Sequence, residues 1–138
     1  MKLYVEAGAK YFVAQATHHD NFFNFDSEVN RFNSVKVGPG KDICGMWKAA
    51  ADKCGIPFGV TEHLSASYCW FAPNKGADSY GKYAGVPYDG NDPDYRDFYY
   101  DNADSYIKGA GPYELKQWYT HNKAFRNYWY LAMSEAIE

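Results

Sequence analysis

The hydrophobic pattern of the chain predicts two short strands with a helix between them. Residues 10–16 form an apolar run rich in aromatic and β-branched side chains, and residues 56–61 form a second apolar run. Such runs are typical of strands that are buried on both faces. Between them, residues 42–54 repeat apolar side chains at helical spacing, with Asp42 placed as the N-cap. We therefore predict a βαβ unit with parallel strands and a right-handed crossover.

Glycine and proline positions mark the ends of these elements. Gly55 ends the predicted helix, and the breaker 38–40 (Gly-Pro-Gly) precedes it. Residues 1–7 are typical of the last turns of a helix that Gly8 closes in the left-handed conformation, and we expect such a start from an internal piece of a longer protein. The side chains expected on the buried face of the central helix are Ile43, Met46, Trp47, Ala50 and Cys54.

The chain beyond the second strand has little periodicity until residue 113. Residues 64–112 are rich in Gly, Asp, Asn, Pro and Tyr, and their aromatic content argues against disorder. We expect an ordered loop over a ligand site, with short helical turns within 94–100 and 103–107. One or two helical turns are predicted within 113–119, and an amphipathic helix from residue 125 to the end.

Composition favours a sugar ligand over a nucleic acid. The net charge is −3, without a basic stripe that would neutralise a phosphate backbone, so no nucleic-acid partner is expected. Aromatic residues make up 20% of the chain and include 14 Tyr and 4 Trp, which suits the stacking of sugar rings. Tyrosines that pack a loop-rich surface explain the same composition about equally well. No apolar stretch is long enough to cross a membrane, and the first residues do not resemble a signal peptide.

The three cysteines are expected to be free, buried thiols. Cys44 and Cys54 lie ten residues apart on one predicted helix, which separates them by about 15 Å, too far for a disulfide. The remaining residue is Cys69, and the chain has no Cys-x-x-Cys spacing that would indicate a metal site.

Polar side chains follow both predicted strands at the point where each strand ends. Because the carboxyl ends of parallel strands meet at one edge of a sheet, where α/β proteins bind ligands, these side chains form the candidate site. They are Thr17, His18, His19 and Asp20 after the first strand, and Thr61, Glu62 and His63 after the second.

The side chains at this edge suggest two kinds of chemistry, a metal site and a pair of catalytic carboxylates. Neighbouring residues of an extended strand point to opposite faces, so His18 and His19 are not expected to share a metal ion, and no metal or cofactor is predicted. Asp20 and Glu62 could form the carboxylate pair of a glycosidase, about 5 Å apart in a retaining enzyme or about 6.5 to 9.5 Å in an inverting one. Alternatively, Asp20 orients an imidazole and Glu62 holds a substrate hydroxyl.

Other catalytic motifs are missing from the sequence. It contains no Gly-x-Ser-x-Gly elbow, no P-loop and no Gly-x-Gly-x-x-Gly. The segment 89–94 (DGNDPD) lacks the downstream acid of a calcium loop, so an acidic turn is expected there.

Several segments of the chain, in the order in which they occur, resemble segments of the α-L-fucosidases of glycoside hydrolase family 29. They are AGAKYFVAQATHHDNFFNFDS, NSV, KDICGMWKAAADKCG and PFGV. The resemblance implies an α/β fold, a (β/α)₈ TIM-type barrel, of which residues 1–138 would supply about two βα units with a long βα loop. It also implies a retaining mechanism with an Asp nucleophile and a separate acid/base. Both are expected beyond Glu138, so that 1–138 would be an inactive fragment of a single catalytic barrel domain.

The same resemblance implies which residues contact the sugar. His18 and His19 would bind the hydroxyls of fucose in a terminal fucosylated glycan or oligosaccharide, with Asp20 orienting an imidazole. Asn21 stands where the family usually has Gly, and residues 61–63 replace its tyrosine- and serine-containing strand end. Further substrate contacts are expected from Glu62, His63 and Trp70.

The resemblance further implies a periplasmic or secreted location, the remainder of the barrel as a partner, and no cofactor. Two alternatives remain open at this point. One is a small carbohydrate-binding module without catalysis, and the other is a metal-dependent hydrolase of a different class.

Overall fold

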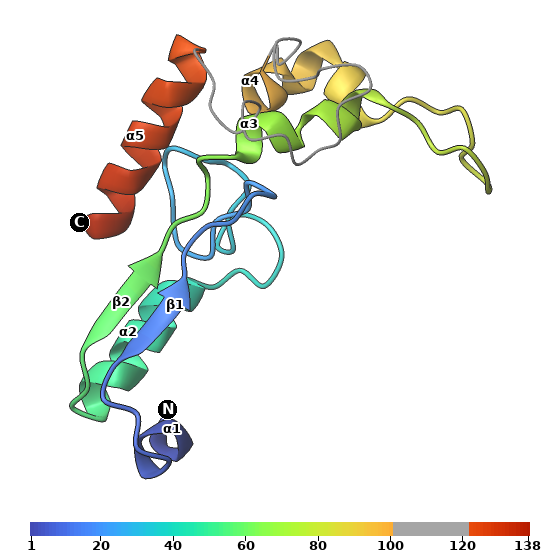
Figure 1. The fold of residues 1–138 in the computed structure, drawn as a ribbon. Helices are drawn as coiled ribbons and strands as arrows, with labels where there is room; N and C mark the ends of the chain where they lie inside the picture. Colours follow the sequence, from blue (N-terminus) through green and yellow to red (C-terminus); the bar gives the residue numbers. More distant parts are fainter. Residues whose placement is uncertain (101–121) are drawn as a thin grey trace. The chain divides into compact units, whose positions relative to one another are not determined.

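The computed structural model describes residues 1–100 and 122–138. The chain divides into two units, Met1–Leu64 with Tyr128–Glu138, and Ser65–Asn127. The turns predicted within 103–107 and 113–119 lie outside the described residues. In chain order the elements are α1 (Lys2–Glu6), β1 (Phe12–Gln15), α2 (Ile43–Lys53), β2 (Phe58–Thr61), α3 (Ser67–Trp70), the 3₁₀ turns η1 (Ala72–Lys75), η2 (Asp89–Asn91) and η3 (Pro93–Tyr95), α4 (Arg96–Tyr99) and α5 (Lys123–Ile137) (Figure 1).

The first unit contains the predicted βαβ arrangement. Strands β1 and β2 pair in parallel, from Phe12 opposite Phe58 to Gln15 opposite Thr61. Helix α2 connects them and packs against both strands (Figure 1). The Trp47 ring lies over Phe12, with 4.9 Å between ring centroids. The prediction of two parallel strands joined by a crossover helix is confirmed.

The prediction that the strands are buried on both faces is wrong for this structure. Along β1, Ala14 is buried and Phe12 is half-buried, whereas Val13 is 44% exposed and Gln15 is exposed. Side chains alternate between the faces of a strand, so one face packs against the core while the other is open to solvent within the described residues.

Helix α2 begins as its sequence predicts. The Asp42 carboxylate accepts a hydrogen bond from the Gly45 N–H at 2.8 Å, which satisfies one of the unpaired donors of the first turn. A side chain at position 45 would collide with that carboxylate, which explains a glycine inside the helix. At the other end, Gly55 follows the helix with φ +67°, the left-handed conformation that favours glycine.

The buried face of α2 agrees with the predicted face at Trp47 but not at Met46. Met46 is 56% exposed, and the residues buried on the helix are Cys44 and Ala51, with Trp47 between them packed on the core. Residues 44, 47 and 51 also follow helical spacing, so the apolar pattern allowed two rotations of the helix. Contact with the strands selects the second one.

The core of the first unit combines the strands, α2, the loop after β1 and the last turns of α5. The buried side chains that cluster there are Ala14, Ala16, Phe23, Phe25, Cys44, Leu64 and Ala132. All three cysteines are free, which confirms the absence of a disulfide, but only Cys44 is buried. Burial raises the pKa of its thiol to about 11.

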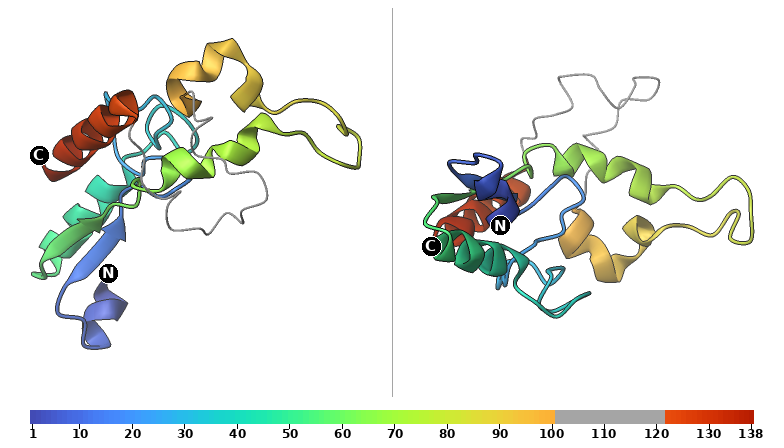
Figure 2. Two further views of the ribbon diagram at one scale, coloured as in Figure 1. Left: turned by 45° about the horizontal axis from the view of Figure 1, so that its top comes forward. Right: turned by 90° about the horizontal axis from the view of Figure 1, so that it is seen from below.

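The described residues of the second unit form short helical turns and a loop. Helix α4 lies within the predicted range 94–100, and residues 89–95 form the two 3₁₀ turns of the expected acidic turn, where Asp92 accepts from the Asp94 N–H. A bridge between Ala77 and Pro87 closes the loop that Figure 2 shows extending from this unit.

Helix α5 begins two residues before the predicted start. The Asn122 side chain accepts from the Phe125 N–H at 3.0 Å, which caps the first turn. Phe125 and Ala132 are its buried residues, as the amphipathic pattern predicts. Among the described residues, no helix is both long enough and apolar enough to cross a membrane.

Candidate functional site

The candidate site lies where the two strands of the first unit end. The Ala16 N–H donates to the Thr61 carbonyl at 2.9 Å, which extends the pairing one residue beyond β1. The buried Thr17 hydroxyl then accepts from the His63 N–H at 3.3 Å. The segments that follow the two strands are therefore held together.

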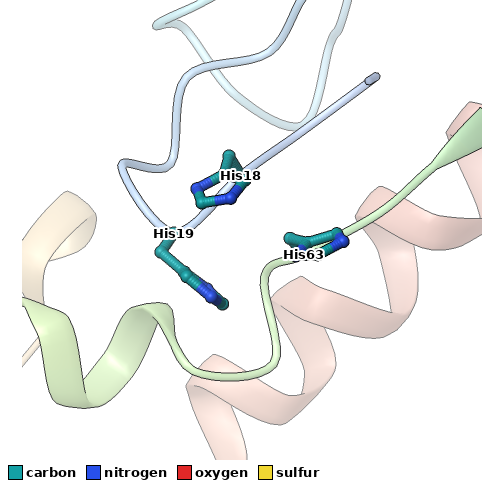
Figure 3. A group of neighbouring side chains, drawn as sticks. All are labelled: His18, His19 and His63. Atoms are coloured by element: carbon teal, nitrogen blue, oxygen red, sulfur yellow. The ribbon is translucent and has the colours of Figure 1, made fainter. Parts of the chain in front are cut away.

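Three imidazoles meet at this edge. The ring centroids of His18 and His19 are 4.6 Å apart, those of His18 and His63 are 5.0 Å apart and nearly parallel, and those of His19 and His63 are 5.7 Å apart. Figure 3 shows the rings gathered between the segment after β1 and the segment after β2. One ring nitrogen from each lies within 4.8 Å of the others. We call these residues the histidine cluster.

The argument that His18 and His19 point to opposite faces is wrong. It assumed an extended strand through both residues, but β1 ends at Gln15. The Asn21 N–H donates to the His18 carbonyl at 2.9 Å, so the chain turns directly after the strand. In a turn the strict alternation of side chains no longer applies, and both rings fall on the same side.

Tyr128, which lies far along the sequence, supports this turn through a hydrogen bond to Asn21. Asn21 has φ +59°, a left-handed conformation that asparagine tolerates better than most residues. Its side-chain oxygen accepts from the Tyr128 hydroxyl at 2.6 Å, and its carbonyl accepts from the Asn30 side chain at 2.7 Å. Tyr128 could not be predicted from the sequence as a support of the site, because no local pattern links a helix position to a loop 107 residues away.

A second contact fixes the same loop to α5. The Glu135 carboxylate accepts from the Ser27 hydroxyl and from the Glu28 N–H. The Ser27 oxygen in turn accepts from the Asn30 N–H at 3.0 Å. These hydrogen bonds hold the loop that carries His18 and His19 against the helix.

The two acidic residues of the edge bond to nearby backbone groups. Asp20 accepts from the Phe22 N–H at 3.2 Å, and Glu62 accepts from the Leu64 N–H. Each carboxylate thus caps a turn two residues ahead in the chain. The proposed roles of Asp20 in orienting an imidazole and of Glu62 in binding a hydroxyl stay predictions.

The remaining predicted contact, Trp70, lies on α3 in the second unit. Its side chain is 46% exposed, while its neighbours Tyr68 and Phe71 are buried. Its contact with a sugar stays a prediction.

The environment of His19 favours its neutral form. Burial lowers the pKa of the His19 imidazole below its usual 6.5, and the neighbouring His18 and His63 lower it further. A hydrogen bond to the His63 backbone and the Glu62 carboxylate act in the opposite direction. A neutral imidazole donates through one nitrogen and accepts through the other, which matches the needs of a hydroxyl group.

Comparison with known proteins gives consistent matches. The family model for alpha-L-fucosidase matches residues 1–138. The tissue alpha-L-fucosidase of Rattus norvegicus is 42% identical over 72 residues, or 51% of this chain and 15% of that protein. The Homo sapiens tissue alpha-L-fucosidase is 39% identical over 72 residues, with the same coverage, and the Dictyostelium discoideum alpha-L-fucosidase is 35% identical over 75 residues, or 54% of this chain and 16% of that protein.

Among solved structures, the Thermotoga maritima alpha-fucosidase in complex with fucose is similar at 41% sequence identity and a TM-score of 0.42. This match covers 43% of this chain and 14% of that chain. The matched part of the chain thus spans about a sixth of the length of the relatives.

Proposed function

Since this chain belongs to the alpha-L-fucosidase family, we propose that the protein that carries it hydrolyses terminal α-L-fucosides of glycans or oligosaccharides. The observation that carries the proposal beyond the family match is the position of His18 and His19. Both imidazoles lie at the carboxyl edge of a parallel strand pair, which is where α/β proteins bind their ligands.

The two histidines have the chemistry to hold a sugar ring. An imidazole in its neutral form donates to one hydroxyl and accepts from another, so two rings 4.6 Å apart are able to engage neighbouring hydroxyls of one sugar ring. Hydrogen bonds to the turn hold the backbone that carries both rings before the sugar binds. Such positioning lowers the barrier of the reaction by presenting the anomeric carbon in a fixed orientation.

We further propose that the fold is part of a (β/α)₈ barrel and that hydrolysis retains the anomeric configuration. The parallel pair β1 and β2 with the crossover helix α2 has the form of a barrel segment. Residues 1–138 would contribute about two βα units and a sugar subsite. The Asp nucleophile and the acid/base carboxyl would then belong to other strands of the protein.

We also propose further contacts with the substrate, based on where each residue lies. His63 faces His18 across the edge and is exposed, so it is able to reach a hydroxyl of the same sugar. Glu62 would bind a further hydroxyl, Asp20 would orient an imidazole, and Trp70 would stack on the sugar or its aglycone.

Kinetics of the intact protein that carries these residues test the proposal. We expect hydrolysis of p-nitrophenyl α-L-fucoside with α-L-fucose as the first product anomer by NMR. We expect kcat/KM to fall in His18→Ala and His19→Ala. Lys48→Ala, which removes an exposed ion pair on α2, is the matched control and retains kcat/KM. Absence of fucoside hydrolysis, or unchanged kcat/KM in both histidine variants, would refute the assignment.

A metal-dependent hydrolase is the second candidate, and the histidine cluster is the specific observation in its favour. If the metal performs the chemistry, the purified protein contains stoichiometric zinc and a chelator abolishes hydrolysis. If the proposed fucosidase mechanism holds, hydrolysis persists after complete removal of metal.

A further inference from the structure

The histidine cluster has the donor atoms of a transition-metal site. The three ligating nitrogens come from two segments of the first unit and lie within 4.8 Å of one another. In a tetrahedral zinc site with Zn–N distances of about 2.0 to 2.1 Å, the ligating nitrogens are about 3.3 Å apart. Each pair of nitrogens therefore has to close by at most about 1.5 Å to hold one ion, which is within the reach of side-chain rotation.

The backbone around the cluster is fixed, while its side chains have room to rotate. The His63 N–H is bound to the Thr17 hydroxyl, and the His18 carbonyl is bound to the Asn21 N–H. The His63 side chain is exposed, and those of His18 and His19 are only half-buried. The His18 and His63 rings stack nearly parallel, so ligation requires one of them to turn toward the other, and the exposed His63 has the room to do so.

The donor set selects the class of metal. The three donors are imidazole nitrogens, and the Asp20 and Glu62 carboxylates bond to the Phe22 and Leu64 N–H groups. Calcium and magnesium prefer oxygen ligands, whereas zinc, nickel and copper(II) bind imidazole well. Three protein nitrogens also leave a fourth position for water, the arrangement of an open zinc site.

We propose that His18, His19 and His63 bind one divalent ion of the zinc class, and that this ion competes with the fucose ring for the same imidazoles. The second half of this inference rests on the proposed function. A nitrogen that coordinates a metal has no lone pair left to accept from a sugar hydroxyl, so we expect metal and sugar to compete even though the other ring nitrogen still donates. The metal would act as a reversible inhibitor of fucoside hydrolysis.

Calorimetric titration of the metal-free, intact protein with zinc chloride tests the site. We expect one ion per chain, and binding weakened by about tenfold or more in His63→Gln and in His18→Gln. His121→Gln replaces the fourth histidine of the chain, and Cys54→Ser replaces a half-buried thiol; both are expected to bind zinc as the unaltered protein does. Thermal melts of each variant check that the fold is retained.

Binding competition between zinc and L-fucose, together with the kinetics of fucoside hydrolysis, tests whether the metal inhibits the enzyme. We expect saturating L-fucose to weaken zinc binding, and zinc to raise the KM for p-nitrophenyl α-L-fucoside while kcat stays constant, with full recovery on chelation. Zinc binding that is unchanged in His63→Gln and His18→Gln overturns the site. Zinc binding that depends on these histidines but leaves the KM unchanged overturns the competition. If the metal binds at the cluster while no fucoside is hydrolysed, the metal site stands and the proposed function fails.

Discussion

The pKa of His19 depends on its two histidine neighbours, so replacing either one has a measurable effect. In His18→Gln we expect the pKa of His19 to rise toward 6.5, because a neighbouring positive charge that lowers it is lost. His63→Gln should raise it less, since His63 contributes less than His18. NMR titration of the imidazole resonances measures both shifts. An unchanged or lower His19 pKa in His18→Gln would contradict the geometry of the cluster.

The same pKa has a consequence for stability. A histidine whose pKa is lowered by folding binds protons more readily in the unfolded chain. Its contribution to the free energy of unfolding is therefore fully present above pH 6.5, the usual value, and is lost as the pH falls through the lowered pKa of folded His19. The His18→Gln variant should lose less stability over this acidic range.

Loss of either sugar-binding imidazole should impair catalysis strongly. We expect His18→Ala or His19→Ala to reduce kcat/KM by an amount that corresponds to about 2 to 4 kcal/mol of transition-state binding, as for other positioned hydrogen bonds in closed sites. Steady-state kinetics on an α-L-fucoside measure the effect in the intact protein.

The buried contact between Asn21 and Tyr128 should stabilise the turn that carries the histidines. Tyr128→Phe leaves the buried Asn21 oxygen without the 2.6 Å hydrogen bond from the hydroxyl, so we expect a loss of about 1 to 3 kcal/mol in the free energy of unfolding. Tyr130→Phe on the same helix is the matched control, because that side chain is exposed, and it should change little. Urea denaturation compares the two, and equal losses would contradict the role of the contact.

Among the secondary-structure elements, α2 offers a local test of the capping argument. Asp42→Ala should lower the free energy of unfolding by about 1 kcal/mol, since the Gly45 N–H loses its partner. Asp42→Asn retains an acceptor oxygen and should cost much less. Asp52→Ala removes only an exposed pair with Lys48, worth about 0.3 to 0.5 kcal/mol, and controls for loss of charge. Denaturant titrations of the three variants show whether the helix is stabilised by the hydrogen bond to the Gly45 N–H or by the negative charge of Asp42.

Signals confined to a few neighbouring residues predicted the elements well. The Asp42 cap, the Gly55 stop and the apolar runs gave α2, β1 and β2 to within two residues at each end. The exact rotation of α2 about Trp47 was not predictable, because positions 43 and 46 on one side of it and positions 44 and 51 on the other are all apolar and follow helical spacing. Burial there is decided by the strands.

At the candidate site too, features set by neighbouring residues were predicted, whereas features set by distant residues were not. The polar residues at both strand ends and the shared edge of a parallel pair followed from the pattern alone. The turn after β1 did not, because it depends on hydrogen bonds with Tyr128 and Glu135, which are 107 and 108 residues away from their partners. Because the turn was not predicted, the alternation of side chains along an extended strand wrongly placed the imidazoles of His18 and His19 on opposite faces.

For the molecule as a whole, the exposure of the strands bears on whether residues 1–138 are part of a larger fold or form a binding module that folds alone. Within the described residues the sheet has two strands, and such a pair is marginally stable without further cover. Apolar side chains on or beside the strands remain open to solvent: Tyr11 is 68% exposed, Val13 44% and Val60 36%. An uncovered apolar surface of this kind favours association.

We therefore expect residues 1–138, expressed alone, to self-associate or bind a hydrophobic dye, and to melt with low cooperativity. Sedimentation velocity and dye fluorescence measure these properties, and Val13→Thr with Val60→Thr should reduce both signals because the exposed apolar area shrinks. A monomeric chain that melts cooperatively and binds L-fucose would instead favour the carbohydrate-binding module. That result would mean that the two strands need no further barrel to cover them, and the proposed barrel would lose its physical basis.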